Sequence, residues 1–188
     1  MTNIVDAFKI PVYRVSLDLN LKTMLTHCNY LRKIDKGMTR SNSGGWHSNF
    51  LNGIHRPLNN LFLEIEKHSR LFSHQLSVDH TVNMDKIWVN INGTNDFNVA
   101  HIHPNCLLSG VFYVKVPKDS GNLVFINPAC DTMIYDWKNF KTFNCYNSAS
   151  LSLTPKENEL FMFPSWLKHQ VDPNNSKKER VSLSFNCS

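Results

Sequence analysis

Two histidines stand one residue apart in AHIHPNCLLSGVFYV, residues 100–114, directly before a strongly apolar run. Side chains two residues apart on an extended strand point to the same face, and Pro104 favours an extended backbone at the residue before it. The imidazoles of His101 and His103 are therefore predicted to lie side by side, as half of a metal site. Taken alone, the pair also fits two ordinary histidines on a loop, because two residues carry little information.

A third histidine and a polar pair near the end of the chain could complete such a site. His169 follows the FPSW turn in ELFMFPSWLKHQVDPNN, residues 159–175. Further on, Arg180 and Ser182 alternate with apolar residues, which places both polar side chains on one face of a strand. A guanidinium that points into a β core needs an anion, and with a hydroxyl it makes a good receptor for one carboxylate. The alternatives are a surface histidine and a solvent-facing arginine.

Short strands separated by turns must position these side chains. Alternating or β-rich runs predict strands after residue 77, at 86–92, 108–116, 121–127, 149–155, 159–167 and 179–186. Turn sequences such as DSGN and DPNN separate several of these runs. Many short strands at this spacing predict a β-sandwich or a barrel-like jelly roll.

The segment before these strands predicts one more strand and two helices. Residues 8–19 alternate around a proline, which is typical of an edge strand. Residues 20–34 show helical spacing of apolar residues behind a cap at Asn20. Residues 56–76 predict a longer helix, with Pro57 in its first turn. We expect both helices to cover a sheet.

The length fits one mainly β (α+β) domain over residues 1–188. The N-terminal strand and supporting helices of 1–77 are expected to pack on one face of a jelly-roll core formed by 78–188. The polar, glycine-rich segment TRSNSGGWHSN at 39–49 is predicted to be a loop that exposes Trp46.

Composition and charge narrow the class of protein. The net charge of +5 is mild and the basic residues are scattered, so no nucleic-acid-binding stripe is predicted. Five cysteines without a CxxC pair do not predict a disulfide framework or a cysteine zinc site, and they fit a reducing cytoplasm. No secretory leader or membrane-spanning run is recognisable. The sequence makes no prediction about oligomeric state.

The motifs together resemble the iron(II)/2-oxoglutarate-dependent oxygenases, which share a double-stranded β-helix (jelly-roll) core behind N-terminal helices. The resemblance is closest to a small bacterial and phage group of these enzymes with the pattern HxHP…SGVYYV…FPSWLxH…RxSxSFN. The corresponding stretches here are HIHP at 101–104, SGVFYV at 109–114, FPSWLKH at 163–169 and RVSLSFN at 180–186. The similarity extends over about residues 86–186, and GGWHS at 44–48 also resembles that group.

This resemblance implies a set of roles. His101 and His169 would bind iron(II), and Arg180, assisted by Ser182, would bind the far carboxylate of the co-substrate 2-oxoglutarate. Tyr113 would either touch that carboxylate through its hydroxyl or be a plain core aromatic. The implied reaction consumes O2, releases succinate and CO2, and hydroxylates a substrate that the sequence does not identify (a peptide, a nucleotide or a small molecule). No catalytic residue beyond the metal centre is implied.

One position departs from the family pattern. The third ligand is usually Asp or Glu, and the chain has His103 there. His103 could coordinate, which gives three neutral ligands. Iron could instead be held by His101 and His169 with water in the gap, or the register could shift so that His103 is the first ligand and Asn105 stands near the place of the acid. The same-face geometry favours three histidines, and the full charge left on iron would then alter activity.

Two other functions remain open. A cupin could use three histidines without 2-oxoglutarate, but cupins usually carry a glutamate soon after HxH, and PNCLLS at 104–109 has none. A non-catalytic jelly-roll binding module could keep a relic site, but a relic has no reason to keep every part. A substrate mouth could be lined by several residues, most of which are expected simply to pack: Trp46, His47, Tyr135, Trp137, Phe140, Phe143 and Tyr146.

Overall fold

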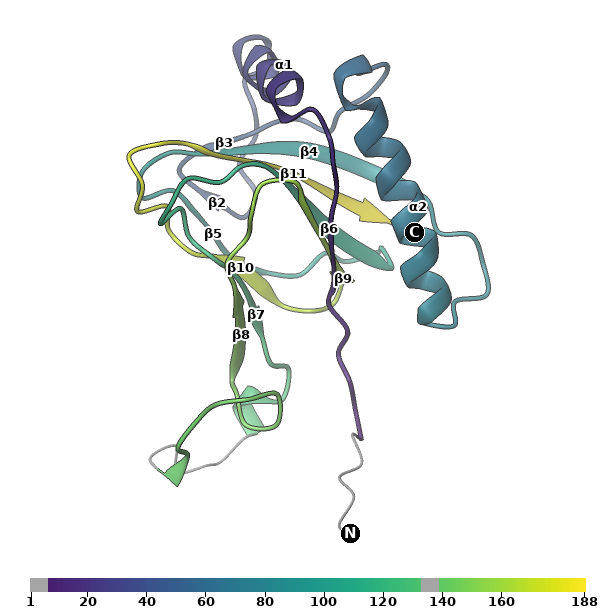
Figure 1. The fold of residues 1–188 in the computed structure, drawn as a ribbon, viewed down its shortest axis with the longest axis vertical. Helices are drawn as coiled ribbons and strands as arrows, with labels where there is room; N and C mark the ends of the chain where they lie inside the picture. The colour runs from purple at the N-terminus through teal and green to yellow at the C-terminus, as the bar shows by residue number, and fades with distance from the viewer. Residues whose placement is uncertain (1–6, 133–138) are drawn as a thin grey trace.

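The computed structural model describes residues 7–132 and 139–188, and it shows two facing antiparallel sheets with two helices (Figure 1). One sheet has six strands in the order β1-β9-β6-β11-β4-β3, and the other has five in the order β2-β5-β10-β7-β8. Consecutive strands along the chain thus alternate between sheets over much of the core, as in a jelly roll. The predicted fold class is confirmed.

The strands that form each sheet come from distant parts of the chain. The six-stranded sheet contains β1 (Tyr13–Ser16), β9 (Glu159–Pro164), β6 (Leu108–Lys115), β11 (Arg180–Cys187), β4 (Met84–Asn92) and β3 (Trp46–His47). The five-stranded sheet contains β2 (Asn42–Ser43), β5 (Phe97–His101), β10 (His169–Val171), β7 (Leu123–Ile126) and β8 (Ser150–Leu153). Short 3-10 turns occur at η1 (Arg56–Leu58) and η2 (Cys130–Thr132).

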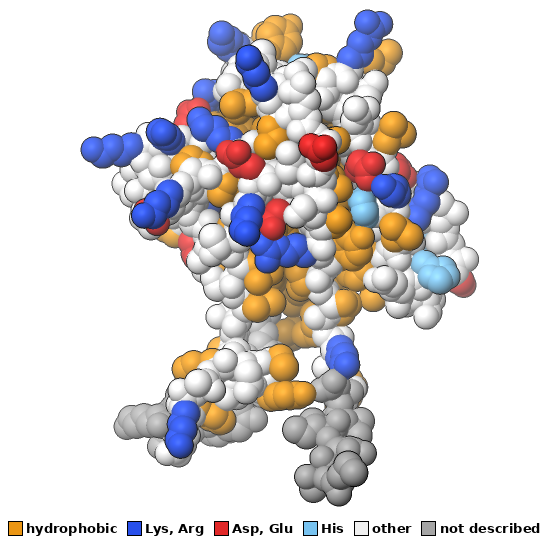
Figure 2. Space-filling model, viewed as in Figure 1, with side chains coloured by type: hydrophobic (Ala, Val, Ile, Leu, Met, Phe, Trp, Pro, Cys, Tyr) orange, Lys and Arg blue, Asp and Glu red, His pale blue; other side chains and the backbone are white. Residues whose placement is uncertain are grey.

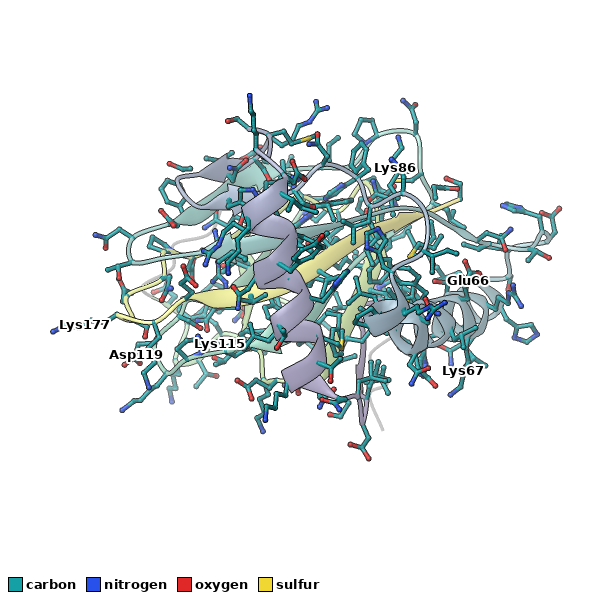
Figure 3. The ribbon with its side chains drawn as sticks, turned by 90° about the horizontal axis from the view of Figure 1, so that it is seen from above. Glu66, Lys67, Lys86, Lys115, Asp119 and Lys177 are labelled. Carbon is teal, nitrogen blue, oxygen red and sulfur yellow. The ribbon has the colours of Figure 1, made fainter. Side chains whose placement is uncertain are left out.

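The two predicted helices are present and cover the outer face of the six-stranded sheet. They are α1 (Leu21–Ile34) and α2 (Asn59–Gln75), and α1 crosses above β11 in the view from above (Figure 3). Asn20 caps α1 as predicted, since its side chain accepts a hydrogen bond from the backbone N–H of Thr23 at 3.1 Å. The helices and the sheet share one apolar core.

Alternation along β11 gives this strand one apolar face and one polar face. Val181, Leu183 and Phe185 are fully buried in the core beneath the helices. Arg180 and Ser182 point the other way, into a cavity between the two sheets. The predicted two-faced character of this strand is confirmed, and it brings a charged side chain into the interior.

The prediction of a loop at 39–49 with an exposed Trp46 is wrong. Two short strands, β2 and β3, lie there and add one strand to each sheet, with a turn at Gly44 and Gly45, both at positive φ. Trp46 is half-buried, and its Nε1 donates to the carbonyl oxygen of Asp35 at 3.1 Å. Pairing with the long strand β4 gives this polar segment a partner that no local pattern indicates.

The β7–β8 hairpin extends away from the body of the molecule (Figure 1). Beyond it, Phe143 packs against Phe140 but is 61% exposed, and Tyr146 is also exposed. Phe143 and Tyr146 therefore lie outside the buried core. Tyr135 and Trp137 lie outside the described residues.

Surface charge is mixed on the face seen in Figure 2, where Lys and Arg side chains are interspersed with Asp and Glu. Figure 3 shows charged side chains at the periphery of the fold, including Lys115 and Asp119 near one end and Glu66 and Lys86 near the other. Within residues 7–132 and 139–188, no helix has the length and apolar character that crossing a membrane requires.

Candidate functional site

Three histidines from three segments converge at one end of the cavity. β10 pairs with β5 so that His169 lies directly opposite His101. His103 lies just beyond β5, where its backbone N–H donates to the carbonyl oxygen of Ser165 at 3.0 Å. The potential ligand atoms of the three rings all lie within 4.8 Å of one another. The predicted side-by-side placement of His101 and His103 is confirmed, with ring centroids 4.9 Å apart.

Backbone carbonyls fix two of these rings. The Nδ1 of His101 donates to Val99 O at 2.7 Å, and the Nδ1 of His169 donates to Leu167 O at 2.8 Å. A carbonyl can only accept, so each Nδ1 carries the proton and each Nε2 is unprotonated. His103 has no such carbonyl partner among the described residues, and its Nε2 lies 3.3 Å from the Nε2 of His169.

Burial keeps the three imidazoles neutral. Desolvation, followed by the charge of His101, lowers the pKa of His169 to about 3. The same two causes lower the pKa of His103 to about 4. Desolvation also lowers the pKa of His101. A neutral imidazole is the form that binds a metal, so the rings are ready to coordinate at neutral pH.

Arg180 lies in the same cavity and is almost fully buried. It is 1% exposed, and its Nη1 donates to the carbonyl oxygens of Ser120 and, at 3.5 Å, of Asp172. Its Nη2 is buried without a partner among the described residues. Burial lowers the pKa of the Arg180 guanidinium, but an arginine stays charged in proteins. An anion in the cavity would supply the partner that this buried cation lacks.

Ser182 and Tyr113 stand beside this guanidinium. Cross-strand register places Ser182 of β11 opposite Tyr113 of β6, and both line the cavity. Burial raises the pKa of Tyr113 to about 12, so its hydroxyl keeps its proton and can donate a hydrogen bond. The ring of Tyr113 also packs edge-on against Phe161, with centroids 6.0 Å apart. Tyr113 is thus both a core aromatic and a cavity-lining residue.

The cavity is narrow, with a volume of about 40 Å³, and both sheets line it. Several polar or aromatic lining residues were not predicted, and they are Ser41, Trp88, Asn90, Asn92, Asn98 and Ser184. The alternation of KIWVNIN carried a signal for three of them, because it places Trp88, Asn90 and Asn92 on one face of β4. None of the described residues that line the cavity is acidic.

Two sequence hypotheses for other residues find no support. Asn105 is exposed and does not line the cavity, which argues against the shifted ligand set. Trp46 and His47 do not line it either. His47 is instead buried, with its ring stacked on Trp88 at 5.5 Å between centroids and 11° between planes.

Residues 86–186, more than half of the chain, match the protein family described as "Putative 2OG-Fe(II) oxygenase". No curated protein matches the chain. The match covers the cavity-lining strands and all three histidines, and it favours an oxygenase over the cupin alternative.

Solved structures with the same fold include several oxygenases. A Pseudomonas putida prolyl-4-hydroxylase is 13% identical, with a TM-score of 0.67 and coverage of 94% of this chain and 92% of that chain. A collagen prolyl hydroxylase of Paramecium Bursaria Chlorella virus-1, solved with 2-oxoglutarate, is 14% identical, with a TM-score of 0.58 and 94% coverage of both chains. HygX from Streptomyces hygroscopicus, solved with nickel and 2-oxoglutarate, is 8% identical, with a TM-score of 0.64 and coverage of 95% of this chain and 83% of that chain.

Proposed function

Because the chain belongs to the 2OG-Fe(II) oxygenase family, we propose that it hydroxylates a substrate C–H bond using Fe(II), 2-oxoglutarate and O2. In this proposal His101, His103 and His169 hold the iron, and Arg180 binds the far carboxylate of 2-oxoglutarate. The observation that carries it is the placement of three neutral imidazoles and one buried guanidinium on a single cavity.

The three histidines fit a divalent transition metal. Imidazole nitrogen suits iron, and each of the three rings contributes one nitrogen to a cluster small enough for one ion. The carbonyl oxygens of Val99 and Leu167 fix the tautomer and the orientation of two rings, as second-sphere partners of metal ligands commonly do. Bound iron would supply the oxidation chemistry, in which 2-oxoglutarate is converted to succinate and CO2.

The guanidinium end fits 2-oxoglutarate. Arg180 Nη2 is buried without a partner among the residues the structure describes, and a carboxylate would complete its hydrogen bonding. The Tyr113 hydroxyl and Ser182 can add neutral donors beside the same carboxylate. The carbonyl oxygens of Ser120 and Asp172 accept hydrogen bonds from Nη1 and so orient the guanidinium.

The absence of an acidic side chain among the described lining residues changes the charge of the site. A third imidazole leaves the charge of iron(II) uncompensated by protein ligands, and Arg180 adds another positive charge. A dianion such as 2-oxoglutarate then supplies the neutralising charge. We therefore expect metal and 2-oxoglutarate to bind with strong mutual dependence.

One titration tests the proposal. Protein loaded anaerobically with Fe(II) should bind 2-oxoglutarate with a visible metal-to-ligand charge-transfer band, at a stoichiometry of about one. The band should be absent with succinate, which lacks the keto group. Succinate release under O2, measured with pools of peptides, nucleotides and small molecules, would then identify the class of substrate. Iron-loaded protein that shows no band and no binding of 2-oxoglutarate would refute the proposal.

A further inference from the structure

The inner face of β4 carries a buried side chain whose hydrogen bonding is incomplete. Asn90 is only 6% exposed. Its Nδ2 donates to Ser184 Oγ at 3.0 Å, but its Oδ1 has no partner among the residues that the structure describes. Buried polar atoms are almost always paired, because an unpaired one costs free energy. Asn90 is therefore poised for a hydrogen bond that a ligand in the cavity would complete.

Strand register places Asn90 between the guanidinium and the histidines. Across β4 and β11, Asn90 lies opposite Ser182, which is the next inward residue of β11 after Arg180. In the other direction along β4, the next inward side chain is Trp88, whose ring centroid lies 5.8 Å from that of His103. A ligand that reaches from the histidines to Arg180 therefore passes Asn90.

The Asn90–Ser184 pair can present either end of the amide to the cavity, because a serine hydroxyl both donates and accepts. When Ser184 accepts from Nδ2, the amide offers Oδ1 as an acceptor. When Ser184 donates to Oδ1, the amide offers Nδ2 as a donor. The 2-oxoglutarate dianion carries only acceptor oxygens, so it selects the second arrangement.

We propose that Asn90 is a further binding residue for 2-oxoglutarate, with its Nδ2 donating to an oxygen of the ligand while Ser184 donates to its Oδ1. This inference rests on the proposed function, since it takes 2-oxoglutarate as the ligand of the cavity. In the free protein only the Oδ1 of this buried amide is unpaired. In the proposed complex Ser184 would pair with Oδ1 and the ligand with Nδ2, so both ends of the amide would be hydrogen-bonded. This arrangement also adds selectivity, because a ligand without an acceptor at this place would leave that amide unsatisfied.

Anaerobic calorimetric titration of Fe(II)-loaded protein with 2-oxoglutarate tests the inference. Asn90→Leu keeps the approximate size and removes both polar atoms, so the Kd should rise about tenfold. Asn90→Asp keeps the shape but offers only a charged acceptor, so repulsion of the dianion should raise the Kd about a hundredfold. Ser184→Ala removes the group that orients the amide and should raise the Kd about threefold.

Asn186→Leu is the matched control. Asn186 lies on the same strand as Ser184, accepts a hydrogen bond from Ser109 at 3.0 Å and does not line the cavity. This variant should leave the Kd unchanged. Iron stoichiometry and the thermal midpoint of each variant establish that the fold and the metal site are intact.

The outcomes separate this inference from the proposed function. Wild-type protein that binds no 2-oxoglutarate would refute the proposed function itself. Wild-type binding together with an unchanged Kd in Asn90→Leu and Asn90→Asp would overturn only the role of Asn90. If neither Asn90 variant folds, Ser184→Ala decides, because an unchanged Kd in that variant contradicts a donor role for the oriented amide.

Discussion

At the scale of single residues, the three histidines are not equivalent. His101 and His169 face each other across a strand pair, and each is held by a backbone carbonyl. His103 lies beyond its strand and has no carbonyl partner among the described residues. Its ring is held instead by contacts with the rings of Trp88 and His169. His103 should therefore be the least firmly oriented of the three.

Alanine variants should show this ranking in metal binding. We expect His101→Ala and His169→Ala each to abolish stoichiometric iron binding, because each removes an oriented donor from a three-donor set. His103→Ala should weaken iron affinity less, by about ten- to a hundredfold. Anaerobic dialysis followed by iron analysis measures both effects. Full iron retention in either of the first two variants would reject their assignment as ligands, and total loss in the third would make His103 a principal ligand.

Arg180 should lower the stability of the ligand-free protein but strengthen the binding of 2-oxoglutarate. Its guanidinium is 1% exposed with an unpaired Nη2, so Arg180→Met should leave the metal-free protein as stable as wild type or more stable. The same change should weaken 2-oxoglutarate binding at least about tenfold, or ~1.4 kcal/mol, because a charge-assisted pair is lost. Thermal midpoints with and without 2-oxoglutarate report both effects. An unchanged ligand-induced rise in the midpoint would remove Arg180 from the site.

The buried histidines should make the metal-free protein sensitive to acid. Burial lowers the pKa of His103 to about 4 and that of His169 to about 3, whereas both titrate near 6.5 when unfolded. Between these values the unfolded chain binds more protons than the folded one. The free energy of unfolding therefore falls as the pH drops below 6.5, by up to ~1.4 kcal/mol per pH unit for each such proton.

Urea unfolding of the metal-free protein between about pH 7 and about pH 5 measures this slope. In His169→Gln the slope should become shallower, because one of the groups that gains a proton on unfolding is gone. A slope identical to that of wild type would show that His169 does not titrate as its burial requires.

At the scale of elements, a short strand supports the site without lining it. β3 pairs with β4 so that His47 lies opposite Asn90. The ring of His47 stacks on Trp88, and Trp88 in turn contacts His103. The GGWHS residues at 44–48 therefore support β4, whose residues line the cavity, without lining the cavity themselves. This explains why residues of a polar, glycine-rich segment are buried.

Close approach of β6, β9 and β11 depends on one glycine. A Cβ at Gly110 would lie 2.2 Å from Phe185 Cζ and 2.6 Å from the carbonyl oxygen of Phe161. The Phe161 carbonyl belongs to a hydrogen-bonded strand, so moving it away from the new Cβ would disturb the sheet. Gly110→Ala should therefore destabilise the protein by about 1–3 kcal/mol. Gly93→Ala is the control, since its Cβ would meet only Asp96 Oδ2, at 3.2 Å, and no backbone atom. Equal urea midpoints for the two variants would contradict this account of the packing.

The sequence predicted long elements better than short ones, for a physical reason. β4, β6 and β11 each have eight or nine residues with one face on the helix-covered core, so their alternation is visible locally. β2, β3 and β10 have only two or three residues and are set by pairing with distant strands. The order of the motifs singled out His101, His103 and His169 as candidate metal ligands. Their convergence, however, depends on the register between β5 and β10. The unpaired amide of Asn90 could not be predicted, because pairing is a property of three-dimensional geometry.

At the scale of the whole molecule, the cavity joins the two sheets. The three histidines belong to the side of the five-stranded sheet, on β5, on the segment after it and on β10. Arg180, Ser182 and Tyr113 belong to the six-stranded sheet, which carries the helices. In the proposed function a metal ion would therefore contact the side of the five-stranded sheet, whereas 2-oxoglutarate would reach from the metal to the six-stranded sheet.

This division predicts a stepwise pattern of protection in amide hydrogen exchange. Metal alone should slow exchange in β5 and β10, because it ties these neighbouring strands together. Adding 2-oxoglutarate at about a hundredfold excess over its Kd should add ~2.7 kcal/mol to the free energy of global unfolding and extend protection to β11 and β6. Succinate, which lacks the keto group that chelates the metal, is the control and should give a smaller effect. Protection that stays confined to β5 and β10 after 2-oxoglutarate is added would mean that the ligand does not reach Arg180, since no contact with the six-stranded sheet would then have formed.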